Sequence, residues 1–418
     1  GDWTLPPQAG GRDPEIRDRV FQRPPGYPYV LAGLYRLAGG RPLAIRGLQM
    51  LAMVGGVALA WALGRRLLGP AVALVWSALL AGNWTLVYFE GGLHGAWLLV
   101  LLSILLLLPL HRFALHPGIS GAAGVGVVVG AMALVRPNVL VAVPPLIVWG
   151  LWVIRGRAGA GRIAAMAGAA CLAGLLFVTP AMVHNWRAER ALVPICANGG
   201  VTLYHGNHPG ADGLSSAAEG AAGRFASPWQ FPRLVRTLEQ RTGRELGFAE
   251  ASNLLGLEAV EWMRRHPRRA LELVGRRALL FWGPHEMAHN SAVAADRAAS
   301  PLLRRLPMPF AWALAGGLVG LGVVVAREWR ARRAGLAARP AGGVETVAAV
   351  VLLALAWFLS YLPFFVTSLY RVPVIPWLLL GCAVAVVELV RLLRARPWRG
   401  VALGVLDRKS TRLNSSHR

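Results

Sequence analysis

Long apolar stretches alternate with short polar turns along most of this chain. Each stretch is about as long as the roughly 17–25 residues that a helix needs to cross a bilayer. Membrane spans are predicted at 47–63, 70–88, 93–110, 118–135, 138–154, 163–183, 307–326, 346–366 and 372–390. Hydrophobic residues make up 55% of the chain and charged residues 15%, as expected when much of the surface faces lipid. The pattern predicts an all-α polytopic membrane protein with about nine spans in this chain.

Arginines gather in every second turn between these predicted spans. They are Arg65, Arg66, Arg112, Arg155, Arg157, Arg162, Arg327, Arg330, Arg332, Arg333, Arg339, Arg391, Arg394, Arg396 and Arg399. Short cytoplasmic loops are enriched in Arg and Lys, so these turns are placed inside and the others outside. The net charge of +24 then reflects topology and contact with anionic lipid. No nucleic-acid partner is needed to explain it.

The same pattern divides the chain into five parts. In order they are an outer loop with a membrane-surface helix near 24–37 (1–46), a six-helix block (47–183), a mixed outer segment (184–305), a three-helix block (306–395) and a cytoplasmic tail (396–418). Within the outer segment, a basic amphipathic helix over 258–282 is suited to resting on anionic headgroups.

Both ends of the chain are expected to be incomplete or foreign. The first predicted loop lies outside but no span precedes it, so we expect a further membrane helix upstream of Gly1. Of the 44 basic residues, all but Lys409 are arginine, and Lys409 lies in an unusually polar run. That run, 407–418, resembles a translated sequencing-adapter tail and is excluded from fold reasoning.

Polar residues at the outer ends of the spans are the first candidates for chemistry, because ionisable groups are costly at membrane depth. Glu90 lies in one outer turn, Arg136 ends the fourth span, and Tyr370 and Arg371 begin the ninth. Arginine makes bidentate contacts with phosphate, and a carboxylate can accept a proton from a nucleophile, so this set suits a phosphorylated lipid. Position alone leaves open that the arginines snorkel and that Glu90 caps or pairs. Glu286, where the outer segment returns to the membrane, could contact substrate, and structural pairing is the favoured alternative.

Metal and cysteine chemistry receive little support. His205, His208 and Asp212 could suggest a metal, but their short spacing in a Gly-rich run favours a plain turn or substrate loop. No cofactor is predicted, and a divalent metal is left open. The three cysteines provide neither a disulfide framework nor metal-ligand spacing.

Several short motifs occur in order along the chain and are all predicted to lie outside. They are Arg-Pro-Pro-Gly-Tyr-Pro (23–28), Glu90, Arg-Pro-Asn (136–138), Asn-Gly-Gly (198–200), Gly-Asn-His-Pro-Gly-Ala-Asp-Gly (206–213), Phe-Trp-Gly-Pro-His-Glu (281–286) and Tyr-Arg-x-Pro-x-x-Pro (370–376). Together they resemble the GT-C membrane glycosyltransferases, specifically the bacterial protein-mannosyltransferase and aminoarabinose-transferase-like families (glycosyltransferase family 39-like). The resemblance covers nearly all of 20–395.

The resemblance implies an activity. A sugar carried on a polyprenyl phosphate would pass, with inversion, to a hydroxyl of a glycan, lipid or protein acceptor. The reaction would take place at the periplasmic face of the bacterial inner membrane. The implied roles are donor-phosphate binding for Arg136, Tyr370 and Arg371, catalysis or acceptor binding for Glu90, and substrate contact for Tyr27, Asn207 and Glu286. The family's main catalytic acid belongs to the first outer loop, and we expect it upstream of Gly1, so that this fragment alone would lack it.

Two other classes stay open at this point. One is another lipid-linked-glycan enzyme, such as an O-antigen ligase or polymerase, with a similarly large outer loop. The other is a transporter or a non-catalytic scaffold. A transporter would be expected to show discontinuous helices or charges near the midplane, whereas these spans are predicted to be uninterrupted with charges at their ends. The Pro-Pro-Gly-Tyr-Pro motif so close to the first span favours the transferase.

Overall fold

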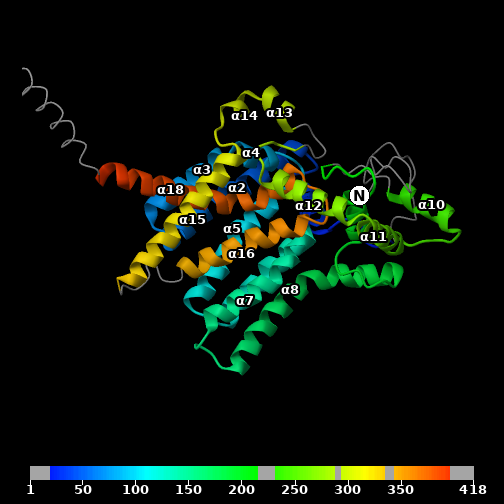
Figure 1. Cartoon of the computed structure of the whole chain (residues 1–418), viewed down its shortest axis with the longest axis horizontal. Coiled ribbons are helices and arrows are strands. Elements are labelled where there is room, and N and C mark those ends of the chain that lie inside the picture. The colour runs from blue at the N-terminus through cyan, green and yellow to red at the C-terminus, as the bar shows by residue number, and fades with distance from the viewer. Residues whose placement is uncertain (1–18, 215–230, 288–292, 335–342, 396–418) are drawn as a thin grey trace, which may run out of the picture.

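The structure, a computed structural model, describes residues 19–214, 231–287, 293–334 and 343–395 (Figure 1). Every regular element in these ranges is a helix, which confirms the all-α class. The α-helices are α1 (Gly26–Leu37), α2 (Pro42–Leu67), α3 (Pro70–Gly82), α4 (Trp84–Glu90), α5 (Ala96–Leu115), α6 (Ile119–Val135), α7 (Val143–Ile154), α8 (Ala160–Glu189), α9 (Gly199–Gly206), α10 (Phe231–Thr242), α11 (Phe248–Arg265), α12 (Pro267–Trp282), α13 (Val293–Ala299), α14 (Pro301–Arg305), α15 (Phe310–Arg333), α16 (Gly343–Tyr361), α17 (Ser368–Arg371) and α18 (Ile375–Ala395). Two short 3-10 helices, η2 (Pro137–Ala142) and η4 (Val372–Val374), join them.

Seven helical segments in the described residues are long and apolar enough to cross a membrane. They are Pro42–Leu67, Ala96–Leu115, Pro137–Ile154, Ala160–Glu189, Pro301–Ala331, Gly343–Tyr361 and Ser368–Arg394. The bent pair α3 and α4 would make an eighth, and α6 is apolar but shorter. These helices confirm a polytopic membrane protein, while the count of nine spans stays a prediction.

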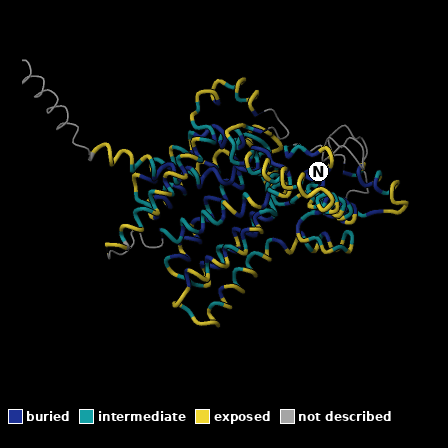
Figure 2. Tube along the Cα trace, viewed as in Figure 1, coloured by how far each residue is buried: buried dark blue, intermediate teal, exposed yellow. Residues whose placement is uncertain are grey.

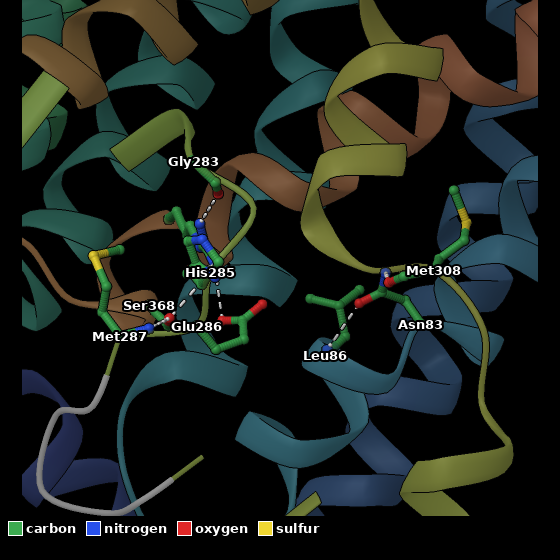
Figure 3. Close-up of polar contacts among 9 residues, drawn as sticks. Asn83, Leu86, Gly283, His285, Glu286, Met287, Met308 and Ser368 are labelled. Carbon is green, nitrogen blue, oxygen red and sulfur yellow. Dashed lines mark hydrogen bonds and ion pairs between the residues drawn. The ribbon is translucent and has the colours of Figure 1, made fainter. Parts of the chain in front are cut away.

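The predicted uninterrupted span over 70–88 is wrong, because the chain bends by 56° between α3 and α4. Asn83 leaves the helical conformation (ψ 113°), and its Oδ1 accepts a hydrogen bond from Leu86 N at 3.0 Å (Figure 3). Its Nδ2 donates to Met308 O at 3.4 Å. An asparagine after a glycine stops one helix and caps the next. The flanking residues stay apolar, so hydropathy alone does not reveal the break.

Glycines bring pairs of membrane helices into close contact. A Cβ on Gly126 of α6 would clash with Ala170 O of α8. A Cβ on Gly320 of α15 would clash with Gly381 O of α18. Small residues allow such backbone approach, and helix association within lipid depends on van der Waals packing. The Gly-rich run at 119–130 therefore serves helix packing.

Burial differs strongly among the spanning helices (Figure 2). α5 and the span that contains α18 are buried over more than half of their apolar windows, whereas α8 is mostly exposed. An apolar helix with an exposed face is expected where that face meets lipid. The enclosed helices thus form the centre of the membrane block.

The outer segment, predicted as mixed, is helical in its described part and has its own apolar core. Phe231, Leu234 and Leu238 of α10 pack there with Leu255 of α11. The predicted basic helix over 258–282 is divided, because α11 ends at Arg265 and α12 begins at Pro267. Proline lacks the N–H that a continuing helix needs but suits a first helical turn.

Candidate functional site

Arg136 lies at the junction between α6 and η2. Pro137 disfavours a helical conformation in the preceding residue, and Arg136 is accordingly extended (φ −149°, ψ 101°). Asn138 Nδ2 donates to Ser360 O of α16 at 3.2 Å and fixes the turn. The Arg-Pro-Asn motif therefore ends a helix and places a cation at its C-terminus, where the helix dipole favours positive charge.

Arg136 contacts Tyr370, so two residues predicted for the donor phosphate do meet. The Arg136 Cζ lies 4.7 Å from the centroid of the Tyr370 ring, a cation–π distance. Tyr370 in turn stacks on Tyr361, with ring centroids 4.5 Å apart and planes at 16°. Trp357 Nε1 donates to Tyr370 O at 2.7 Å and holds its backbone. A buried aromatic pair thus supports the guanidinium.

Two groups that the sequence analysis did not single out lie within electrostatic range of Arg136. Arg23 precedes α1 and interacts with both Arg136 and Tyr370. His94 follows the Gly91-Gly92 turn, and burial, with a further contribution from the Arg136 charge, lowers its pKa to about 4. His94 Nδ1 accepts from Ala96 N at 3.4 Å, which assigns the proton of the neutral ring to Nε2. Arg23 is the first residue of the Arg-Pro-Pro-Gly-Tyr-Pro motif and His94 lies four residues after Glu90, which is the signal that could have found them.

Glycines bring the Pro-Pro-Gly-Tyr-Pro motif against this end of α6. A Cβ on Gly26 would lie 2.8 Å from Leu134 O. A Cβ on Gly95 would lie 2.8 Å from Val135 Cγ1 and 3.2 Å from Tyr27 Cβ. Larger residues would push α1 and the 91–95 loop away from α6. The two glycines therefore permit the approach of Arg23 and His94 to Arg136.

The charge of Arg136 is not balanced by a carboxylate within the described part of the chain. None of the ion pairs found there includes this residue, although its side chain is half-buried. A cation held near membrane depth is costly unless an anion or other polar partner compensates it. With Arg23 and His94 also within electrostatic range, the arrangement is suited to bind an anion.

Arg371, the neighbour of Tyr370, is bound elsewhere. Its side chain is fully buried, and Nη1 donates to Gly283 O at 2.8 Å. Nη2 donates to His285 O at 2.9 Å and lies 2.8 Å from Glu286 Oε2. The Arg371 guanidinium also lies over the Phe310 ring, 4.1 Å from its centroid. Both of its terminal nitrogens are thus engaged by the protein, while Nε has no hydrogen-bond partner, and geometry gives its predicted phosphate role no support.

Glu286 meets Arg371 at ion-pair distance, but neither of its carboxylate oxygens has the alignment of a hydrogen bond (Figure 3). Both oxygens are buried, and the side chain is 11% exposed. The adjoining backbone is fixed because Met287 N donates to Ser368 Oγ at 2.6 Å. A buried carboxylate with unused acceptor capacity is unusual and marks Glu286 as a candidate contact for a substrate donor group.

Asn207 is fully buried and uses its polar atoms internally. Its Nδ2 donates to Leu203 O at 2.8 Å and to Pro363 O at 2.6 Å. Its Oδ1 accepts from Arg277 Nη2 at 3.2 Å. The predicted substrate role of Asn207 therefore gains no geometric support and stays a prediction.

Arg277 belongs to the predicted basic helix over 258–282, which was expected to rest on lipid headgroups. For this residue the expectation is wrong. It is fully buried and donates to Leu362 O at 2.8 Å and to Gly206 O. Burial lowers its pKa to about 10. Arg277 therefore joins α12 to α9 and to the turn after α16.

The turn 362–371 carries most of these attachments. Leu362 O and Pro363 O accept the hydrogen bonds described above. Gly206 packs closely on the same turn, because a Cβ added to it would lie 2.7 Å from Phe364 O. Val366 N donates to Gly213 O at 3.1 Å. We call 362–371 the docking turn, because it joins the outer segment to the membrane helices and also carries Tyr370.

The other predicted site residues are less connected. Glu90 ends α4 half-buried, and no ion pair in the described ranges includes it. Its role stays a prediction. His205 and His208 lie near each other, but no group of three or more His, Cys, Asp or Glu in the described ranges could hold a metal. A metal site at His205, His208 and Asp212 is therefore not supported.

These features define a multi-pass helical membrane protein with an anion-binding candidate site between α1, α6 and the docking turn. Residues 22–184 match the family model described as dolichyl-phosphate-mannose-protein mannosyltransferase. The match covers fewer than half of the residues; it contains Arg23, His94 and Arg136 but not the docking turn. No curated protein and no solved structure matches the chain significantly. The family match supports a GT-C-like membrane glycosyltransferase that uses a lipid-linked sugar donor.

Proposed function

We propose that the chain moves a sugar from a polyprenyl phosphate to an acceptor hydroxyl, with inversion, at the outer face of a bacterial inner membrane. The observation that carries this proposal is the environment of Arg136. Its cation lies on Tyr370, has Arg23 and His94 in electrostatic range, and forms no ion pair within the described part of the chain. A lipid phosphate is an anion, and its lipid tail holds the charged group at the membrane boundary, where this proposal places Arg136.

Arg136 and Arg23 would bind the donor phosphate. As the bond from the anomeric carbon to the phosphate oxygen breaks, negative charge increases on that oxygen. Guanidinium donors held in place beforehand stabilise this charge without reorganising. The neutral His94 would add a hydrogen bond from Nε2 and keep it over the physiological pH range.

The acceptor oxygen forms its bond to the anomeric carbon from the opposite face and loses a proton to a carboxylate. Glu90 and Glu286 are the carboxylates proposed for the acceptor side. Glu286 has acceptor capacity to offer, and Arg371 lies 2.8 Å from its Oε2 and orients it. In this proposal Arg371 positions a carboxylate and does not hold the phosphate.

One observation bears on the transporter alternative. The bend at Asn83 is a helix discontinuity of the kind that carriers use to expose backbone groups. Here Asn83 itself caps the new helix and joins it to Met308. The break is thus closed by internal hydrogen bonds, which favours a rigid scaffold for a site.

The test is binding of undecaprenyl phosphate to the purified chain. Arg136→Gln should raise the dissociation constant about 10- to 100-fold, because hydrogen bonds to a charged group contribute about 1.5–3 kcal/mol. Arg66→Gln, in the last helical turn of α2, is the matched control and should bind like the wild type. In an assay of sugar transfer to an acceptor, Arg136→Gln should also lower kcat by about 10²–10³. Unchanged affinity in Arg136→Gln would refute the phosphate assignment.

A further inference from the structure

Three buried polar atoms without a hydrogen-bond partner meet between α1, α2 and α5. They are the Tyr27 hydroxyl, Gln49 Oε1 and Trp97 Nε1. Gln49 is fully buried and Trp97 is 4% exposed. The Tyr27 hydroxyl lies close to both other side chains, although no pair has the alignment of a hydrogen bond. Buried polar atoms are nearly always well paired, so three such atoms together have hydrogen-bonding capacity for one further group.

The donors and acceptors in this cluster identify that group. Gln49 Nε2 donates to Gly92 O at 3.5 Å, which leaves Oε1 as an acceptor. The indole N–H of Trp97 can only donate. Burial raises the pKa of Tyr27 to about 12, so its phenol stays protonated and can donate. The cluster therefore presents one acceptor and two donors.

A single alcohol hydroxyl matches this set, since it has one proton to donate and two lone pairs to accept. A phosphate oxygen would be repelled by Gln49 Oε1, and an ammonium group would leave both donors unpaired. The aromatic rings of Tyr27 and Trp97 add apolar surface of the kind that suits a sugar ring. The chemistry thus points to a hydroxyl on a small polar ring.

The cluster lies beside the proposed phosphate site. Gly95 is in contact range of Tyr27 on one side and of Val135, the residue before Arg136, on the other. The 91–95 loop provides Gly92 O to Gln49 and carries His94, which interacts with Arg136. A sugar attached to a phosphate at Arg136 would therefore lie next to this loop.

We propose that Tyr27, Gln49 and Trp97 bind one hydroxyl of the donor sugar and thereby select that sugar. This rests on the proposed function, because it takes the lipid phosphate at Arg136 as given. A site built to hydrogen-bond a substrate hydroxyl discriminates strongly against an analogue that lacks it, because the buried partners are then left unpaired. A trapped water would also satisfy the three atoms, and the experiment separates the two occupants.

The experiment measures dissociation constants of the whole chain, in detergent, for a short polyprenyl phosphate bearing mannose and for each monodeoxy-mannose derivative. Mannose is the probe because the matched family is described by it. One derivative should bind the wild type at least about 10-fold more weakly. Tyr27→Phe should weaken the parent compound similarly and become insensitive to that same derivative. Tyr29→Phe is the matched control, since Tyr29 is on the same helix and 67% exposed.

Trp97→Phe provides a second variant with a conserved ring and should reproduce the loss of selectivity. Equal affinity of the wild type for all deoxy derivatives would overturn the proposal and leave water as the occupant. An equal loss for sugar-free and sugar-bearing lipid in Tyr27→Phe would also overturn it, as a purely structural effect. If the wild type fails to bind sugar-free undecaprenyl phosphate, the proposed function itself fails. If Arg136→Gln abolishes that binding while the deoxy series stays flat, only the sugar assignment fails.

Discussion

Replacing Arg371 by methionine should destabilise the protein and leave phosphate binding intact. The guanidinium is fully buried, lies 2.8 Å from Glu286 Oε2 and donates to Gly283 O and His285 O. Removing one partner of a buried ion pair leaves an uncompensated charge and costs about 3–5 kcal/mol. The two carbonyl groups also lose a donor, so the upper part of this range applies.

The assay is thermal unfolding of the purified protein in detergent, together with undecaprenyl phosphate binding by the folded fraction. A loss of this size should lower Tm by roughly 3–6 °C in a chain of 418 residues. Arg371→Met with Glu286→Gln should recover part of the loss, since no charge is then left unpaired. Arg391→Met is the matched control, because Arg391 belongs to α18 and its side chain is 71% exposed. An Arg371→Met protein with wild-type Tm and no phosphate affinity would refute this reasoning and restore the role predicted from the motif.

Two further predictions concern the outer segment. Arg277→Met should make it more sensitive to limited proteolysis, because Leu362 O and Gly206 O lose their buried donor, whereas the exposed Arg276→Met should not. Burial, with a further contribution from His208, lowers the pKa of His205 to about 4, against 6.5 in an unfolded chain. Between these two values the unfolded state binds more protons than the folded state, so the free energy of unfolding rises with pH. The gain is up to about 3 kcal/mol; it is complete above pH 6.5 and is lost as the pH falls towards 4. His205→Gln should flatten that part of the profile of Tm against pH, and an unchanged slope would contradict the assignment.

The membrane fold could be predicted because hydropathy and arginine placement act over whole helices. Every predicted span has a helical counterpart, although the stretch at 70–88 bends. The break depends on one residue, Asn83, which leaves the helical conformation and caps the next helix. Hydropathy carries no information on such a change of backbone conformation. The division of the basic helix before Pro267 was not predicted but could have been, since proline favours the first helical turn.

The candidate site was partly predictable for a similar reason. Proline forces Arg136 out of the helix, so its position at the end of α6 follows from local sequence. Arg371 and Arg277 are different, because a buried arginine and an exposed one have the same sequence pattern. Only the carbonyl groups that surround them in three dimensions distinguish the two cases. His94 was missed because its meaning depends on the distant Arg136.

The docking turn gives the molecule a modular construction. Within the described ranges, Arg277, Asn207, Gly213 and Met287 all attach the outer segment to 362–371. If the outer segment is exchanged between related proteins, this turn should therefore be transferred together with it. The same ten residues carry Tyr370, which supports Arg136, so the transferred segment would include part of the proposed phosphate site. Acceptor recognition and donor chemistry would then be inherited jointly, and a change of acceptor would be constrained by the need to keep Tyr370 against Arg136.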